Sequence, residues 1–213
     1  MTKTNLDGPR REPSNGAAPD SLVIFLHGYG SNGDDLIGLS SYWDKLLPTT
    51  AFASPNAPES LPGMSAAYQW FALTTMDPTI VAVSARAAAP VLKAFIIAEM
   101  ARHKVGPERT VLVGFSQGTM IALEVGLAWP TAFAGIIGFS GALVGFETAA
   151  SKPPILLIHG DQDDRVPYAA SVGAVAVLKA AGLNARLHTS PRTAHSIAMD
   201  GLQAGAGFLK SVL

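Results

Sequence analysis

The sequence predicts an α/β fold, built as a mostly parallel, doubly wound sheet with helices on both faces and no large cap domain. Short apolar runs without alternation, rich in β-branched residues, are typical of strands buried on both faces of a parallel sheet. Such runs recur at 22–26, 111–113, 136–139 and 155–158, and a further strand-like stretch covers 185–189. Helical patterns separate them, and this alternation favours a doubly wound sandwich.

The predicted helices follow the strands in order along the chain. They cover 34–47, 80–103, 117–128, 168–181 and 202–213. Pro90 lies inside the second of these, so we expect a kink or a break near it. Gly182 is a candidate C-cap of the fourth.

The chain is predicted to form one domain over residues 21–213, preceded by a flexible tail over residues 1–20. The tail alternates prolines with polar residues and shows no apolar period. Residues 54–78 fit neither helix nor strand, although they contain Tyr68, Trp70 and Phe71. Loops of this length in compact domains are usually functional or disordered, and three aromatic residues argue against disorder.

Composition excludes several classes of protein. The 213 residues are 48% hydrophobic and carry a formal net charge of −1, without a stripe of lysine or arginine, so nucleic-acid binding is not expected. No uninterrupted apolar run approaches the roughly 18 residues of a membrane helix. The first residues contain no apolar segment typical of a secretory signal, so cytoplasm is the default compartment. The absence of cysteine excludes disulfides and a cysteine nucleophile.

The segment Gly114-Phe115-Ser116-Gln117-Gly118 predicts a nucleophilic serine. It is a G-x-S-x-G motif directly after a predicted strand and directly before a predicted helix, where a sharp turn lifts the serine hydroxyl out of the sheet. The alternative is a glycine-rich loop in which Ser116 is an ordinary N-cap. Ser140 also follows an apolar run, but no helix pattern comes after it, so we interpret it as a strand-end residue near the site.

A serine hydroxyl needs a general base and an orienting carboxylate, which in this fold class follow in the order serine, acid, histidine. Asp161, Asp163 and Asp164 cluster at the exit of the predicted strand 155–158. Some of them are expected to satisfy the turn's own backbone N–H groups, with Asp161 the first choice for that role. His195 lies in a loop after the last strand and is the candidate base, whereas His188, inside that strand, is interpreted as structural.

The glycines around Tyr29, in Leu26-His27-Gly28-Tyr29-Gly30, follow the first predicted strand. They allow backbone N–H groups to face the oxyanion that forms when a serine attacks a carbonyl. We expect the backbone N–H groups of Tyr29 and Gln117 to form this oxyanion hole. A phosphate-binding turn is the alternative, but the spacing fits neither common phosphate-binding motif.

These pieces together resemble the phospholipase/carboxylesterase family of α/β-hydrolases, which includes acyl-protein thioesterases and bacterial carboxylesterases. The matching segments are LHGYGSNGDDL (26–36), PNAPE (55–59), QWF (69–71), GFSQGTM (114–120), HGDQDDRVP (159–167) and AHSI (194–197). The resemblance implies a Ser116, Asp163 and His195 triad, with Asp164 as the fallback acid, and places Trp70 and Phe71 in the substrate pocket. Ala194 departs slightly from the pattern, because glycine commonly precedes the catalytic histidine in such enzymes.

The resemblance further implies a carboxylesterase that cleaves small to medium acyl esters through an acyl-serine intermediate, with no cofactor or metal. A small-molecule ester is the expected partner, and a homodimer is possible by analogy. Acyl-protein thioesterase or lysophospholipase activity is the first alternative; it needs a long acyl channel, for which residues 54–78 leave limited material. A catalytically silent ligand-binding protein is the alternative from a different class. A dienelactone-type hydrolase usually relies on a cysteine, which this chain lacks.

Overall fold

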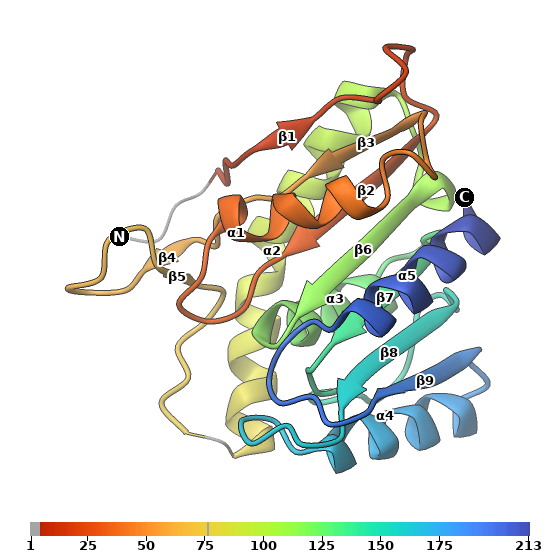
Figure 1. The fold of residues 1–213 in the computed structure, drawn as a ribbon. Coiled ribbons are helices and arrows are strands. Elements are labelled where there is room, and N and C mark those ends of the chain that lie inside the picture. The colour runs from red at the N-terminus through yellow and green to blue at the C-terminus, as the bar shows by residue number, and fades with distance from the viewer. Residues whose placement is uncertain (1–4, 76) are drawn as a thin grey trace.

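The computed structural model describes residues 5–75 and 77–213 and contains the predicted doubly wound sheet (Figure 1). Seven strands lie in the order β1-β3-β2-β6-β7-β8-β9, and all neighbours are parallel except β1 and β3. The strands are β1 (Arg10–Arg11), β2 (Ser21–Leu26), β3 (Thr50–Ala53), β6 (Thr110–Phe115), β7 (Gly135–Phe139), β8 (Ile155–Gly160) and β9 (Ala185–Ser190). The predicted fold class is therefore confirmed.

Helices cover both faces of the sheet, and each layer buries its own apolar cluster (Figure 1). One face carries α2 (Pro78–His103), α3 (Gln117–Leu127) and α4 (Tyr168–Ala180), and the other carries α1 (Gly33–Ile37) and α5 (Met199–Val212). Strands β2, β6, β7 and β8 are buried along nearly their whole length, because helices pack on both sides of them. This explains why their sequences are continuously apolar rather than alternating.

Parallel pairing brings the carboxyl ends of these strands to one edge of the sheet. In the ladder Leu26 pairs with Gly114, and Phe115 pairs with Phe139. The turns that follow β2, β6, β7 and β8 therefore meet at the same edge, which is where open α/β sheets bind their ligands.

Two predicted helices differ from the observed ones. The predicted helix 34–47 ends early, and a 3-10 helix (Gly38–Tyr42) follows α1. The hydroxyls of Ser40 and Ser41 donate to the carbonyls three residues earlier, at 2.6 and 2.7 Å, and such bonds compete with the regular α-helical ladder. Helix α2, by contrast, continues through Pro90 without a break.

Helix α2 remains intact because Pro90 is on its exposed side and removes only one backbone hydrogen bond, while Ala85, Leu92 and Ile96 are fully buried on the other side. By length and composition alone α2 could cross a membrane, since an 18-residue window has a mean hydropathy of 1.8. Core helices of globular proteins pass the same test. Its buried face belongs to the apolar cluster beneath the sheet.

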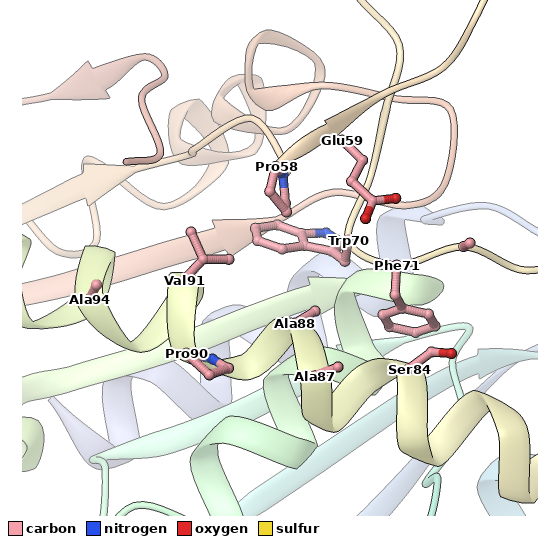
Figure 2. A pocket seen from close by; sticks show the side chains of 11 residues that line it. Pro58, Glu59, Trp70, Phe71, Ser84, Ala87, Ala88, Pro90, Val91 and Ala94 are labelled. Atoms are coloured by element: carbon pink, nitrogen blue, oxygen red, sulfur yellow. The ribbon is translucent and has the colours of Figure 1, made fainter. Parts of the chain in front are cut away.

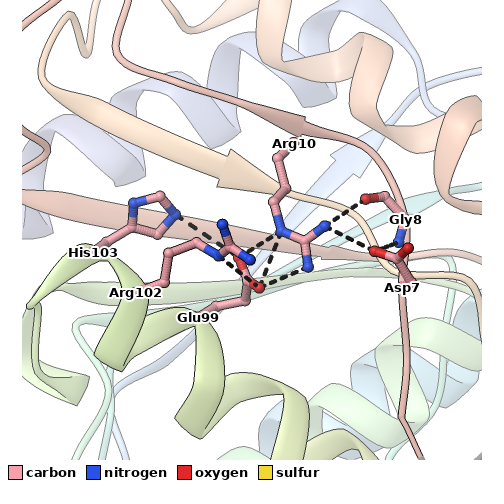
Figure 3. Close-up of polar contacts among 6 residues, drawn as sticks. All are labelled: Asp7, Gly8, Arg10, Glu99, Arg102 and His103. Carbon is pink, nitrogen blue, oxygen red and sulfur yellow. Dashed lines mark hydrogen bonds and ion pairs between the residues drawn. The ribbon is translucent and has the colours of Figure 1, made fainter.

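The expectation of a flexible tail is wrong for residues 5–20, the described part of that segment. Strand β1 pairs antiparallel with β3, and Leu6 is buried in the apolar cluster beside α2. The guanidinium of Arg10 binds the carboxylate of Glu99 on α2 through three hydrogen bonds of 2.8–3.1 Å (Figure 3). Residues 5–20 have no periodic pattern of their own. They are held in place by the ion pair with the buried Glu99 and by the pairing of β1 with the edge of β3.

The described part of residues 54–78 contains a small hairpin of β4 (Glu59–Ser60) and β5 (Tyr68–Gln69). Two backbone hydrogen bonds, Gly30 N to Tyr68 O at 2.8 Å and Tyr68 N to Ser31 O at 3.0 Å, attach the hairpin to the turn after β2. The hairpin thereby delivers the next two residues, Trp70 and Phe71, to the carboxyl edge of the sheet.

Candidate active site

Ser116 lies on a strained turn between β6 and α3. Its backbone has φ 53° and ψ −114°, in the positive-φ region that non-glycine residues rarely adopt. A methyl group on Gly114 would lie 2.4 Å from the backbone of Gly118, and one on Gly118 would lie 1.8 Å from the carbonyl oxygen of Leu26. The two glycines of the motif are therefore required by the close approach of strand, turn and helix.

The structure brings Ser116, Asp163 and His195 together from three different turns. The Nε2 atom of His195 is 3.0 Å from the hydroxyl oxygen of Ser116, and its Nδ1 atom is 2.8 Å from Oδ2 of Asp163. Because an ionised carboxylate can only accept, Nδ1 carries the proton and Nε2 is left to accept one from the hydroxyl. The ring of Phe115 packs against the imidazole with the centroids 4.9 Å apart.

Asp163 uses both oxygens of its fully buried carboxylate. Oδ1 accepts the backbone N–H groups of Arg165 and Val166, each at 2.9 Å, while Oδ2 faces His195. Burial raises the pKa of this carboxyl, but the hydrogen bonds from His195 and the two backbone amides outweigh it, so the pKa lies below its ordinary value. The carboxylate is therefore ionised at neutral pH.

The other two aspartates of the cluster lie outside this arrangement. Asp164 is exposed, and the carboxylate that hydrogen-bonds the imidazole of His195 is that of Asp163. Asp161 accepts the backbone N–H of Arg192 at 2.6 Å. The expectation that Asp161 satisfies its own turn is therefore wrong: it binds the loop that carries His195, while Asp163 accepts the N–H groups of the turn.

His159 is a residue of this site whose place the sequence analysis does not anticipate. Its imidazole is fully buried behind the carboxylate, with Nε2 2.9 Å from the carbonyl of Val166 and 3.2 Å from Oδ2 of Asp163. Nδ1 lies 2.7 Å from the hydroxyl of Ser171 on α4. The signals for it in the sequence are its position four residues before Asp163, at the end of a buried strand, and its place at the start of the matching segment 159–167.

Tyr29 and Gln117, whose backbone N–H groups are the expected oxyanion donors, lie in two segments next to the serine. Gln117 is the first residue of α3, and the first N–H groups of a helix have no acceptor within it. Tyr29 follows β2, and a methyl group on the preceding Gly28 would lie 3.4 Å from Cβ of Ser116. Both amides therefore belong to segments that touch Ser116.

Trp70 and Phe71 are almost fully buried and form one wall of a cavity of about 640 Å³ against α2 (Figure 2). Small side chains of α2, including Ala87 and Ala88, form the opposite wall. The side chain of Gln117, the residue after Ser116, hydrogen-bonds the backbone of both Trp70 and Phe71. A second apolar cavity of about 340 Å³ includes Met120 on the next turn of α3.

The remaining candidates occupy structural positions. Ser140 is buried at the end of β7, and its hydroxyl has no hydrogen-bond partner within the described residues. His188 lies 2.8 Å from Asp200 at the start of α5. This contact ties β9 to α5 on either side of the loop that carries His195.

Comparisons with known proteins agree on one relationship. The profile of a family described as Phospholipase/Carboxylesterase matches residues 13–213. Acyl-protein thioesterase 1 of Mycosarcoma maydis is 30% identical over 230 residues, covering 94% of this chain and 95% of that protein. Esterase YpfH of Escherichia coli is 27% identical, covering 89% and 82% respectively. Among solved structures, esterase PE8 superposes with a TM-score of 0.93 at 45% identity, covering 98% of this chain and 100% of the other.

Proposed function

The chain belongs to the phospholipase/carboxylesterase family, and from that premise we propose that it hydrolyses carboxylic esters with Ser116 as nucleophile, His195 as general base and Asp163 as orienting carboxylate. The observation that carries the proposal is the hydrogen-bonded series from Asp163 through His195 to Ser116. A buried carboxylate fixes the tautomer of an imidazole, and that imidazole accepts the proton of a serine held in a strained turn.

In the first step, the hydroxyl oxygen of Ser116 attacks the ester carbonyl carbon while its proton passes to Nε2 of His195. The carbonyl oxygen becomes an oxyanion, which the backbone N–H groups of Tyr29 and Gln117 stabilise. Each such donor is typically worth about 2.7–4 kcal/mol in the transition state. The ionised carboxylate of Asp163 stabilises the imidazolium formed in this step.

In the second step, His195 returns the proton to the leaving alcohol, and the bond between carbonyl carbon and alkoxy oxygen breaks. The acyl group is then attached to Ser116. A water molecule attacks this acyl-serine, with its proton accepted by His195, and the acid is released as the proton returns to Ser116.

The substrate pocket that we propose is lined by Trp70 and Phe71 and suits small to medium acyl esters. The cavity that Trp70 and Phe71 line measures about 640 Å³, and the hairpin that precedes these two residues spans only residues 59–69. A thioester gives the same chemistry with a thiol as leaving group, so acyl-protein thioesterase activity is the second candidate, supported by the similarity to acyl-protein thioesterase 1. Rates on the acetate, butyrate and palmitate esters of p-nitrophenol separate the two, since an optimum at palmitate contradicts the first.

Labelling with a fluorophosphonate, followed by peptide mass spectrometry, tests the proposed nucleophile. We expect modification of Ser116 in the wild-type chain, none in Ser116→Ala, and strongly reduced labelling in His195→Ala. The Ser140→Ala variant is the matched control, since it removes a serine hydroxyl at the neighbouring strand end and is expected to label normally. A folded wild-type chain that does not label contradicts the proposal and favours a silent, ligand-binding role.

A further inference from the structure

Trp70 contacts both segments that carry the proposed oxyanion donors. The residue is 1% exposed, and its two N–H groups point in different directions. The backbone N–H donates to Oε1 of Gln117 at 2.9 Å, and the indole Nε1 donates to the carbonyl oxygen of His27 at 2.8 Å. Trp70 thus links the start of α3, through its backbone N–H, to the turn after β2, through its indole N–H.

On the α3 side, the amide of Gln117 is held at both ends. It is fully buried, and while Oε1 accepts from Trp70, Nε2 donates to the carbonyl of Phe71 at 2.7 Å. Because one partner is a donor and the other an acceptor, only one orientation of the amide satisfies both. The backbone of Gln117, which carries one oxyanion donor, is therefore fixed against the hairpin exit.

On the β2 side, the buried imidazole of His27 continues the connection. Its Nε2 accepts the backbone N–H of Ala57 at 2.9 Å, so its Nδ1 donates to the carbonyl oxygen of Gly28 at 2.7 Å. That carbonyl belongs to the same planar peptide as the N–H of Tyr29, and the two point in opposite directions. The hydrogen bond from His27 to the carbonyl oxygen of Gly28 therefore also fixes the direction of the Tyr29 N–H.

We propose that Trp70, besides lining the cavity, is a positioning residue that sets the geometry of the oxyanion hole. The inference rests on the proposed function. The ladder between β2 and β6 ends at Leu26 and Gly114, so the two amides lie beyond the last paired residues. Trp70 connects them through two hydrogen bonds. Donors of an oxyanion hole act only when they are held in place before the charge develops.

The test compares Trp70→Phe with Trp43→Phe. Trp43 is also fully buried and donates its indole N–H to a backbone carbonyl, that of Leu202 at 3.1 Å, but it lies in the apolar cluster on the opposite face of the sheet. Both substitutions keep an aromatic ring and remove one buried hydrogen bond. We expect similar losses of thermal stability from the two variants.

Only Trp70→Phe is expected to lower kcat on p-nitrophenyl butyrate, by about tenfold, with KM changed less than threefold, because a small displacement of positioned groups costs about this much in rate. A trifluoromethyl ketone forms a tetrahedral adduct whose oxyanion occupies the hole. Its affinity should fall by the same factor in Trp70→Phe and stay unchanged in Trp43→Phe. Binding of the corresponding methyl ketone should not change in either variant.

Equal kcat and equal trifluoromethyl ketone affinity in the two variants would overturn the inference. So would a rise in KM alone, which is the result for a residue that only lines the pocket. If Trp70→Phe does not fold, Gln117→Met removes the other end of the same connection and must show the same pattern. Fluorophosphonate labelling of the wild-type chain separates the two claims. Labelling of Ser116 with indistinguishable tryptophan variants refutes only the role of Trp70, whereas absence of labelling refutes the proposed function.

Discussion

Replacement of Asp163 by asparagine should disable the proposed catalytic series while leaving the turn intact. The Oδ1 atom accepts two backbone N–H groups at 2.9 Å, so the amide oxygen of the asparagine has to stay there. The amide nitrogen then takes the place of Oδ2, 2.8 Å from Nδ1 of His195. Two N–H groups cannot face each other, so His195 is forced to carry its proton on Nε2, where it can no longer accept the proton of Ser116.

An imidazole held in the wrong tautomer typically costs about 10⁴-fold in kcat, equivalent to about 5.4 kcal/mol of transition-state stabilisation. The assay is kcat and KM on p-nitrophenyl butyrate near pH 8, with thermal unfolding as a check on the fold. Asp164→Asn is the matched control, because this neighbouring side chain is exposed, and it should retain activity within about twofold of wild type. An Asp163→Asn enzyme with more than a tenth of wild-type kcat, or equal losses in the two variants, would refute the reasoning.

Three further predictions concern the glycines, pH and the N-terminal segment. Gly118→Ala places a methyl group 1.8 Å from the carbonyl oxygen of Leu26 and should lower kcat by about 100-fold or more. Gly207→Ala places its methyl group more than 4 Å from the described residues outside its own stretch of helix, and it should leave kcat unchanged in the same ester assay. Burial lowers the pKa of His27 from its ordinary 6.5, so the unfolded chain takes up a proton that the folded chain excludes. In urea unfolding, the free energy of unfolding should therefore fall as the pH drops below about 6.5, with up to about 1.4 kcal/mol per pH unit from His27. The plot of this free energy against pH should be less steep for His27→Gln, and equal slopes in the two proteins would contradict the prediction. Arg10→Ala leaves the buried carboxylate of Glu99 without its main partner, and the free energy of unfolding should drop by about 3 kcal/mol; a change under about 0.5 kcal/mol would show that the pair contributes little.

The parts of the fold that follow from local patterns could be predicted from the sequence. Buried parallel strands are continuously apolar, and the G-x-S-x-G segment shows its glycines directly, because the turn at Ser116 has no room for a side chain on either side. The order of serine, acid and histidine restricts the candidates for the remaining positions. The resemblance to a known family was needed to choose between Asp163 and Asp164, which are adjacent and chemically identical.

The parts that depend on long-range contacts could not be predicted in this way. Whether residues 5–20 pack on the domain depends on a carboxylate at Glu99, 89 residues from Arg10. The link from Trp70 to Gln117 joins residues 47 apart, and neither shows in its own segment what it will bind. The apolar spacing of residues 34–47 predicts a continuous α-helix and gives no sign of the 3-10 helix after α1. That helix depends on hydrogen bonds from the serine hydroxyls, which the spacing of apolar residues does not show.

The two-residue strand β1 protects one edge of the sheet from pairing with other copies of this chain. It pairs with the outer side of β3 at Phe52 and Ala53, so a chain trimmed to begin at residue 21 would leave that part of the edge of β3 unpaired. An open edge of this kind is a template for strands of other molecules. A domain boundary drawn from composition alone would therefore convert a protected sheet into one prone to edge-to-edge aggregation.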